Sequence, residues 1–302
     1  MSVSSIVRPS PARPDPRAVL TLLKPVTWFP PMWAFTCGAV SAGVALTDRF
    51  AVLALGILIT GPLVCASSQA VNDWFDRHVD AINEPNRPIP SGRIPGQWGL
   101  ALAILWTALS LLAAVPLGTF GVVAVGIALL FSWGYSAPPL RFKQNGWIGN
   151  LAVGITYEGL AWVTGAGIML GSRVPPAPIL LLALLYSLGA HGIMTLNDFK
   201  AIEGDQKMGV RSLPVLLGPD GAARVASAVM LAAQVVVIAL LVSWARPMHA
   251  AAIAVLVCLQ AAMMWRFLGA PRERALWLSA LGVPFYASGM MIAAFAVREV
   301  IA

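Results

Sequence analysis

Charged residues are scarce in this sequence, and that shortage excludes an ordinary soluble protein. Only 11% of the 302 residues are Asp, Glu, Lys or Arg, where a soluble domain carries roughly 25%. Hydrophobic residues make up 58%, and the mean hydropathy is +0.78. The long apolar stretches also lack the polar face that a surface helix of a soluble protein needs. The composition therefore predicts an all-α integral membrane protein.

Cysteine is nearly absent as well, and no basic soluble domain is present. Cys37, Cys65 and Cys258 are isolated in apolar stretches without CxxC or metal-ligand spacing, which favours packing over redox or metal chemistry. The net charge of +7 has no soluble domain to carry it, so nucleic-acid binding is excluded.

The first 24 residues are rich in Pro, Ser and Arg, and they lack the apolar core and cleavage site of a signal peptide. We expect residues 1–24 to be a mostly disordered cytoplasmic tail ending at an interfacial anchor near Lys24. Residues 25–302 are then expected to form one transmembrane domain.

Apolar runs recur along the rest of the chain at about the length that spans a bilayer as a helix, roughly 20 residues. We predict nine transmembrane helices from them. The nine segments are residues 28–47, 51–71, 97–116, 118–138, 148–170, 176–197, 221–244, 248–268 and 275–297.

The basic residues predict the orientation of these helices. With the N-terminus in the cytoplasm, 16 of the 20 Lys and Arg residues fall on the cytoplasmic side. These are Arg8, Arg13, Arg17, Lys24, Arg77, Arg87, Arg93, Arg141, Lys143, Lys200, Lys207, Arg211, Arg224, Arg266, Arg272 and Arg274. The other four are Arg49, Arg173, Arg246 and Arg298. The positive-inside rule favours this orientation, and omitting one helix would destroy the pattern.

Although charged residues are scarce overall, acidic residues cluster in one segment. It is residues 72–93, NDWFDRHVDAINEPNRPIPSGR. On a helix with about 100° per residue, four polar side chains share one face. They are Asn72, Asp73, Asp76 and Asp80. Three carboxylates on one arc repel each other at a membrane boundary, so this face predicts a compensating cation.

A second cluster repeats the first at an offset of 125 residues. Residues 197–205, NDFKAIEGD, place Asn197, Asp198 and Asp205 at equivalent positions, while Asp76 is replaced by Ala201. The repeat indicates two related halves, and both clusters fall at the cytoplasmic ends of their helices in the predicted topology.

Carboxylate oxygens in this number favour a hard divalent cation, and Mg²⁺ is typical where phosphate is also a ligand. Basic residues near both clusters suit a phosphate group: Arg87, Arg93, Arg141, Lys143, Lys200, Lys207 and Arg211. A substrate with a diphosphate head and a long apolar tail would lie naturally across this boundary.

At these residues the sequence resembles the UbiA superfamily of intramembrane prenyltransferases. Its N-x-x-x-D-x-x-x-D motif is matched by Asn72, Asp76 and Asp80. Its second motif, D-x-x-D-x-x-G-D, is matched by Asp198 and Asp205, with Ala201 in place of the middle aspartate.

Four longer strings are similar to those of chlorophyll and bacteriochlorophyll synthases, most of all the latter. They are KPVTW, NDWFDRHVDAINEPNRPIPSG, YSAPPLRFKQNGWIGN and NDFKAIEGDQKMGVRSLPV. The resemblance implies nine transmembrane helices around a central cavity, in a bacterial inner or intracytoplasmic photosynthetic membrane, with the active site at the cytoplasmic face. It also implies that geranylgeranyl or phytyl diphosphate esterifies the propionate of bacteriochlorophyllide a or chlorophyllide a.

The resemblance assigns expected roles to the motif residues. The metal ligands for Mg²⁺ are Asn72, Asp76, Asp80, Asp198 and Asp205, and the four aspartates among them are the catalytic residues. The substrate-binding set is Asp73, Arg87, Arg93, Tyr135, Arg141, Lys143, Asn197, Lys200, Lys207 and Arg211. A propionate is already ionised near neutral pH, so the nucleophile needs no base.

Other interpretations stay open at this stage. A quinone precursor or haem could be the acceptor, a transporter would place its acids near the bilayer midplane, and a pigment-binding protein would need histidines within its helices. Only His191 meets that last need, either as a ligand of the macrocycle's magnesium or as a packed, hydrogen-bonded side chain. Glu158 either binds a polar edge of the acceptor or accepts a hydrogen bond from a neighbouring helix.

Overall fold

The computed structural model describes residues 13–301, and within them every regular element is helical. The main helices are α1 (Pro16–Leu23), α2 (Phe29–Ser41), α3 (Phe50–Leu58), α4 (Ala66–Asn83), α5 (Trp98–Ala114), α6 (Gly118–Ser136), α7 (Gly146–Gly154), α8 (Ala161–Met169), α9 (Ala177–Asp198), α10 (Ile202–Met208), α11 (Leu213–Ser243), α12 (Pro247–Leu268) and α13 (Pro271–Ile301). Two π-helices, η3 (Ile59–Cys65) and η6 (Ile155–Leu160), join α3 to α4 and α7 to α8. Short 3-10 turns are η1 (Pro25–Thr27), η2 (Leu46–Arg49), η4 (Val115–Leu117), η5 (Phe142–Gln144) and η7 (Phe199–Ala201).

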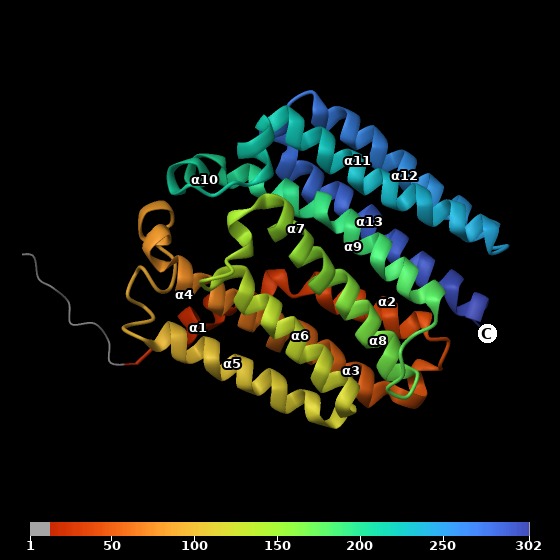
Figure 1. Cartoon of the computed structure of the whole chain (residues 1–302), viewed down its shortest axis with the longest axis horizontal. Coiled ribbons are helices and arrows are strands. Elements are labelled where there is room, and N and C mark those ends of the chain that lie inside the picture. Colours follow the sequence, from red (N-terminus) through yellow and green to blue (C-terminus); the bar gives the residue numbers. More distant parts are fainter. Residues whose placement is uncertain (1–12, 302) are drawn as a thin grey trace, which may run out of the picture.

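Seven stretches of the described chain are long and apolar enough to cross a membrane. One of them, Trp98–Ser136, reverses at η4, so α5 and α6 run antiparallel beside each other (Figure 1). Counting α5 and α6 separately gives eight segments, and the shorter α2 is the ninth. Together they correspond to the nine segments predicted among residues 13–301. The predicted all-α integral membrane fold is confirmed.

Close packing of the two halves depends on glycine. A Cβ added at Gly38 of α2 would lie 2.0 Å from the carbonyl oxygen of Trp162. A Cβ at Gly165 of α8 would lie 2.1 Å from that of Phe35. Such small residues allow transmembrane helices to touch backbone to backbone.

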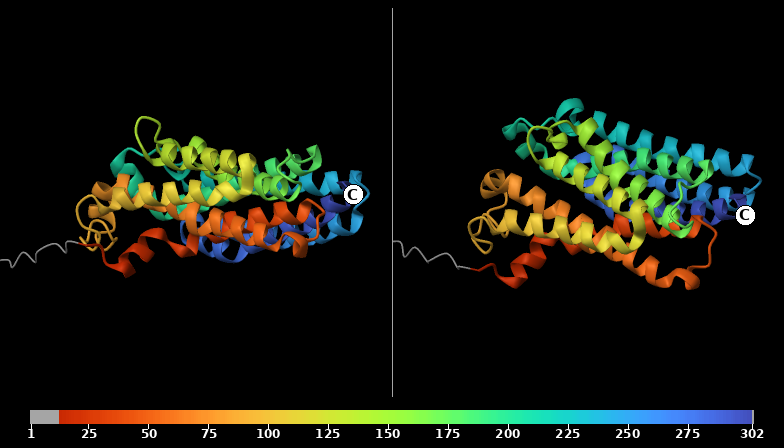
Figure 2. Two further views of the ribbon diagram at one scale, coloured as in Figure 1. Left: turned by 90° about the horizontal axis from the view of Figure 1, so that it is seen from below. Right: turned by 60° about the horizontal axis from the view of Figure 1, so that its bottom comes forward.

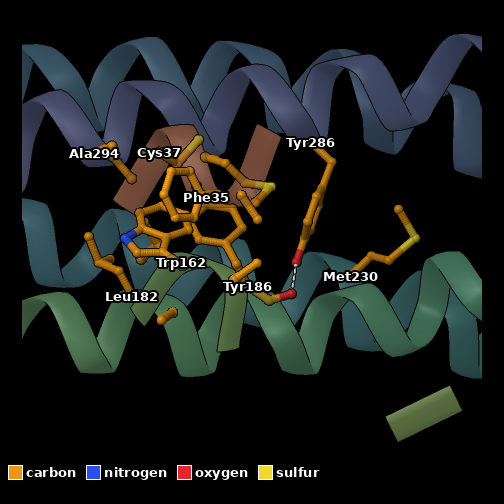
Figure 3. Close-up of a cluster of buried hydrophobic side chains, with 14 of the residues drawn as sticks. Phe35, Cys37, Trp162, Leu182, Tyr186, Met230, Tyr286 and Ala294 are labelled. Atoms are coloured by element: carbon orange, nitrogen blue, oxygen red, sulfur yellow. Dashed lines mark hydrogen bonds between the residues drawn. The ribbon is translucent and has the colours of Figure 1, made fainter. Parts of the chain in front are cut away.

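An aromatic cluster fills the core between α2, α8, α9 and α13 (Figure 3). Trp162 stacks on Tyr186 with ring centroids 5.6 Å apart, and Tyr186 meets Tyr286 edge to face at 5.2 Å. The hydroxyl of Tyr286 donates a 2.6 Å hydrogen bond to the carbonyl oxygen of Tyr186. This cluster holds the bundle together below the polar end.

The N-terminal segment differs from the prediction. Residues 1–12 of the expected disordered tail lie outside the described residues, but Pro16–Leu23 forms α1, so disorder is the wrong prediction there. The Asp15 side chain caps α1 by accepting a hydrogen bond from the Arg17 N–H at 3.0 Å. Ala18 and Leu22 are fully buried in a cluster with residues of α4 and α5.

Both aspartate segments lie at the same end of the bundle. The end of α4 and the end of α9 with α10 are neighbours at the left of Figure 1, and the rotated views agree (Figure 2). Between them lies the loop that joins α6 to α7. The fold therefore collects three segments distant in sequence into one polar cap.

Candidate active site

Asp73 is the most deeply buried carboxylate of the cap, with 1% of its surface exposed. Its Oδ1 accepts hydrogen bonds from Lys24 Nζ at 2.7 Å and from Arg87 Nη1 at 3.2 Å. Two cations therefore compensate one charge that has almost no access to water. The ammonium of Lys24, which was predicted to anchor the chain at the interface, thus turns inward to Asp73.

Arg87 folds the loop after α4 back onto that helix. Besides Asp73, its guanidinium contacts Asp80 at 2.9 Å and forms an ion pair with Glu84. Burial alone would lower the pKa of Arg87, but the Glu84 hydrogen bond and the charges of Asp73 and Asp80 outweigh it and raise the pKa. The Arg87 hydrogen bond in turn lowers the pKa of Glu84. Arg87 is thus a clamp on three carboxylates and stays charged.

Asp76 faces the loop between α6 and α7. Lys143 Nζ lies 2.5 Å from its Oδ1, and Asn72 Nδ2 lies 3.1 Å from its Oδ2. Asn72 Nδ2 also contacts the hydroxyl of Ser136 at 3.1 Å. Burial lowers the pKa of Lys143, and the Asp76 carboxylate opposes that shift.

The second aspartate motif has a different partner. Asn150 of α7 donates a 2.9 Å hydrogen bond to Asp198 Oδ2 and approaches the hydroxyl of Thr195 at 3.2 Å. The amide of Asn197 faces the sulfur of Met194 at 3.9 Å and has no contact with a carboxylate in the described chain. Asp205 is half-buried in α10, and Ala201 begins that helix as its N-cap.

The two motifs converge through the α6–α7 loop. An isolated parallel β-bridge pairs Asn145 with Arg211. In it Arg211 N donates to Gln144 O at 3.0 Å and Gly146 N donates to Arg211 O at 2.8 Å. Tyr135 lies close enough to both motifs to interact electrostatically with three of their carboxylates, those of Asp76, Asp198 and Asp205. Both aspartate motifs therefore lie near Tyr135.

Several predicted cations have no carboxylate partner within residues 13–301. The backbone of Arg141 is left-handed, with φ 39°, and its Nε is buried with no hydrogen-bond partner within residues 13–301. Lys200, Lys207 and Arg211 are exposed. Arg93 instead binds its own loop, through the Ser91 hydroxyl at 3.1 Å and the Asn86 carbonyl oxygen at 2.7 Å. Arg141 is therefore the cation best placed to receive an anion.

The carboxylates do not form a closed metal cage. Within the described residues, no three His, Cys, Asp or Glu side chains are grouped so as to hold a metal ion. Mg²⁺ commonly takes only one or two protein carboxylates and completes its shell with water and substrate phosphate. The hard oxygen donors around Tyr135, beside the free Arg141 cation, fit an ion that binds together with phosphate oxygens.

An apolar cavity, partly open to its surroundings, lies below the polar cap. Its walls come from α2, α3, η3, α6, η6 and α8, and they include Phe35, Val125, Ala128 and Ala161. Cys65, in the wall, lies seven residues before Asn72 on a continuous helical stretch, which is about 10 Å along the axis. The cavity is thus within reach of the aspartates.

Some contributors to the site are missing from the sequence prediction. Lys24, Ser136 and Asn150 all touch a motif residue. Lys24 lies in the string KPVTW and Asn150 in YSAPPLRFKQNGWIGN, and the resemblance of these strings to the family could have pointed to both residues. The hydrogen bonds expected for the packed forms of Glu158 and His191 are absent in the described chain, where Glu158 Oε2 and both His191 nitrogens are buried without partners.

Comparison with known proteins relates this chain to a family of prenyltransferases. The profile of the UbiA prenyltransferase family matches residues 27–296. The Bacteriochlorophyll synthase 33 kDa chain of Rhodobacter capsulatus is 53% identical over 96% of this chain and 97% of its own length. The chloroplastic chlorophyll synthase of Oryza sativa is 38% identical over 92% of this chain and 76% of its own. A UbiA homologue from Archaeoglobus fulgidus, solved with GPP and Mg²⁺ bound, has a TM-score of 0.66 at 23% identity, covering 93% of this chain and 99% of its own.

Proposed function

Because the chain belongs to the UbiA prenyltransferase family, we propose that it esterifies the propionate carboxylate of bacteriochlorophyllide a with geranylgeranyl diphosphate and releases diphosphate. The 53% identity to a bacteriochlorophyll synthase over nearly the whole length supports this acceptor. Chlorophyllide a and phytyl diphosphate are the alternative acceptor and donor. The observation that carries the proposal is a polar cap of aspartates and cations whose first motif residue lies about 10 Å along a helical stretch from the wall of an apolar cavity.

The cations of the cap bind the diphosphate of the donor. Arg141 offers a guanidinium nitrogen without a partner, and Lys143 holds an ammonium at the edge of the same site. Lys200 and Arg211 border it from the second motif. Positive charge at this point stabilises the negative charge that develops on the diphosphate as the allylic C–O bond breaks.

The metal ligands proposed for this chain are Asn72, Asp76, Asp80, Asp198 and Asp205. A bound Mg²⁺ would add positive charge where the diphosphate departs. With such an ion between them, the aspartates of the two motifs would hold the diphosphate between α4 and α10, and the prenyl chain would extend into the cavity. Phe35, Ala128 and Ala161 surround that chain with apolar surface and exclude water from the allylic carbon.

The acceptor needs positioning and no proton transfer. Its propionate is ionised near neutral pH, so an oxygen lone pair forms the new C–O bond while the old bonding pair leaves with the diphosphate. No proton is lost, which distinguishes this reaction from prenylation of an aromatic ring. The excess of basic residues at the polar end supports a cytoplasmic location for this site and for the N-terminus.

A test of the function uses membranes from a non-photosynthetic host that expresses the chain. The membranes receive geranylgeranyl diphosphate and Mg²⁺ with bacteriochlorophyllide a, chlorophyllide a or 4-hydroxybenzoate in parallel. We expect the ester of bacteriochlorophyllide a, and Asp76→Ala membranes with equal amounts of folded protein should form none. If only chlorophyllide a forms an ester, chlorophyllide a is the acceptor and the proposed one is wrong. If only 4-hydroxybenzoate is prenylated, the acceptor is not a tetrapyrrole.

A further inference from the structure

His191 of α9 is buried in a way that packing alone does not explain. It is 6% exposed, and neither ring nitrogen has a hydrogen-bond partner within residues 13–301. The main chain of Trp147 approaches the ring but does not reach hydrogen-bond geometry. Buried polar side-chain atoms almost always have a partner, because an unsatisfied one has lost its hydrogen bonds to water without replacement. Two free nitrogens on one buried imidazole therefore indicate a ligand.

The surroundings of His191 are flat and apolar. The indole of Trp147, on α7, stacks on the imidazole with ring centroids 5.5 Å apart and 28° between the planes. Trp147 is 44% exposed, and no hydrogen bond holds its indole N–H in the described chain. Leu184 and Leu188 precede His191 by seven and three residues, so they share its helix face, and both are exposed. The imidazole thus lies under an aromatic ring beside the lipid-facing surface.

The position of His191 relative to the carboxylates is set by the helix. Asp198 follows by seven residues, two turns further along the same face of α9 and about 10 Å away along its axis. Thr195 lies between them and donates to the His191 carbonyl oxygen at 2.9 Å. That separation is comparable with the distance from the centre of a tetrapyrrole to the end of a propionate side chain.

We propose that His191 is the axial ligand of the magnesium at the centre of the acceptor macrocycle, and that Trp147 packs against the face of that ring. This inference rests on the proposed function, because it takes the acceptor to be a magnesium tetrapyrrole. A neutral imidazole nitrogen donates its lone pair to the metal in place of a water molecule. Trp147 turns from the imidazole onto the macrocycle, and the propionate extends toward Asp198.

The test measures binding rather than turnover. The purified full chain in lipid nanodiscs is titrated with bacteriochlorophyllide a and with bacteriopheophorbide a, the same ring without magnesium. We expect His191→Phe to weaken binding of the magnesium ring at least tenfold and to leave binding of the metal-free ring unchanged. His249→Phe, a histidine in the first turn of α12, is the matched control and should change neither affinity.

Resonance Raman spectra of the bound ring report the coordination of its magnesium directly. The wild type should show a nitrogen ligand, His191→Gly should lose it, and added imidazole should restore it. The wild-type protein with ¹⁵N-labelled histidine tests the same ligand, because the label should shift the band of a magnesium–histidine bond. The inference can therefore be tested even if a His191 variant does not fold. Equal affinities in wild type and His191→Phe, or a wild-type spectrum without a histidine ligand, would overturn the inference.

The outcomes also separate this inference from the proposed function. Ester formation by His191→Phe with an unchanged KM for the acceptor would refute the inference alone. Magnesium-dependent binding that requires His191, in a chain that forms no ester with any tetrapyrrole, would refute the proposed reaction and leave the ligand site standing.

Discussion

Lys143 Nζ lies 2.5 Å from Asp76 Oδ1 and joins the loop before α7 to the first aspartate motif. The two side chains are only 12% and 19% exposed, so each depends on the other for charge compensation. A diphosphate and its metal ion would compete for both partners. The pair therefore keeps cation and carboxylate in place until the substrate arrives.

Replacing Lys143 should weaken donor binding more than it slows chemistry. We expect Lys143→Met to raise the KM for geranylgeranyl diphosphate about tenfold or more, because one charge-assisted contact to phosphate is lost. Lys143→Arg should keep most of the affinity. Initial rates at varied donor concentration check this, and an unchanged KM in Lys143→Met would contradict it.

Two neighbouring aspartates should differ in what their loss affects most. Asp76→Asn is expected to lower kcat at least 100-fold, because a proposed ligand of the metal ion at the leaving group is removed. It should cost less stability than Asp73→Asn, because Asp76 has one cation partner, Lys143, and is 19% exposed. Asp73→Asn should cost about 2 kcal/mol or more in unfolding free energy, because the Lys24 and Arg87 charges lose their buried partner.

Thermal unfolding in detergent, together with kcat, separates the two variants. Glu84→Gln serves as the control, since the Glu84 side chain is 56% exposed and its pair with Arg87 contributes less than about 1 kcal/mol. A stable Asp73→Asn protein would show that Lys24 and Arg87 do not need the carboxylate.

Metal removal gives a third prediction. Treatment with EDTA should abolish ester formation, and Mg²⁺ should restore it, while the chain stays folded because Lys24, Arg87 and Lys143 still balance the carboxylates. Activity and a thermal unfolding midpoint measured on the same sample check both parts. Full activity in EDTA would refute the need for a divalent cation.

Filling the apolar cavity should change the donor chain length. Ala128→Phe places a ring in the cavity wall, so we expect the KM for geranylgeranyl diphosphate to rise at least tenfold and that for geranyl diphosphate to change little. Leu130→Phe on the same helix is the matched control, because Leu130 is 73% exposed on the outer surface. Equal effects on both donors would place the prenyl chain elsewhere.

The helices and the motif residues were predictable because their signals are local. Apolar length predicts the spans, and helical spacing places Asp76 and Asp80 on one face. The partners of these residues were not predictable, since Lys24 meets Asp73 across 49 positions and Asn150 meets Asp198 across 48. Contacts of that kind depend on how α1 and α7 pack.

Two local features also escaped prediction. The predicted span starts at residue 221, because Gly218 and Pro219 interrupt the hydrophobic run before it. The structure instead begins α11 at Leu213 and continues it past a break at Gly218, whose φ is 69°. The π-helix η3 contains Pro62, whose missing N–H a wider turn accommodates, and composition alone does not reveal such a turn.

The most direct test of the proposed reaction follows the oxygen atoms. Both propionate oxygens of bacteriochlorophyllide a are labelled with ¹⁸O. The labelled compound is incubated with the chain, geranylgeranyl diphosphate and Mg²⁺, and the masses of the products are measured by mass spectrometry. Attack by the carboxylate on the allylic carbon predicts an ester that keeps both labelled oxygens and a diphosphate without label. An ester that has lost one ¹⁸O, or no ester at all from folded protein, would contradict the account.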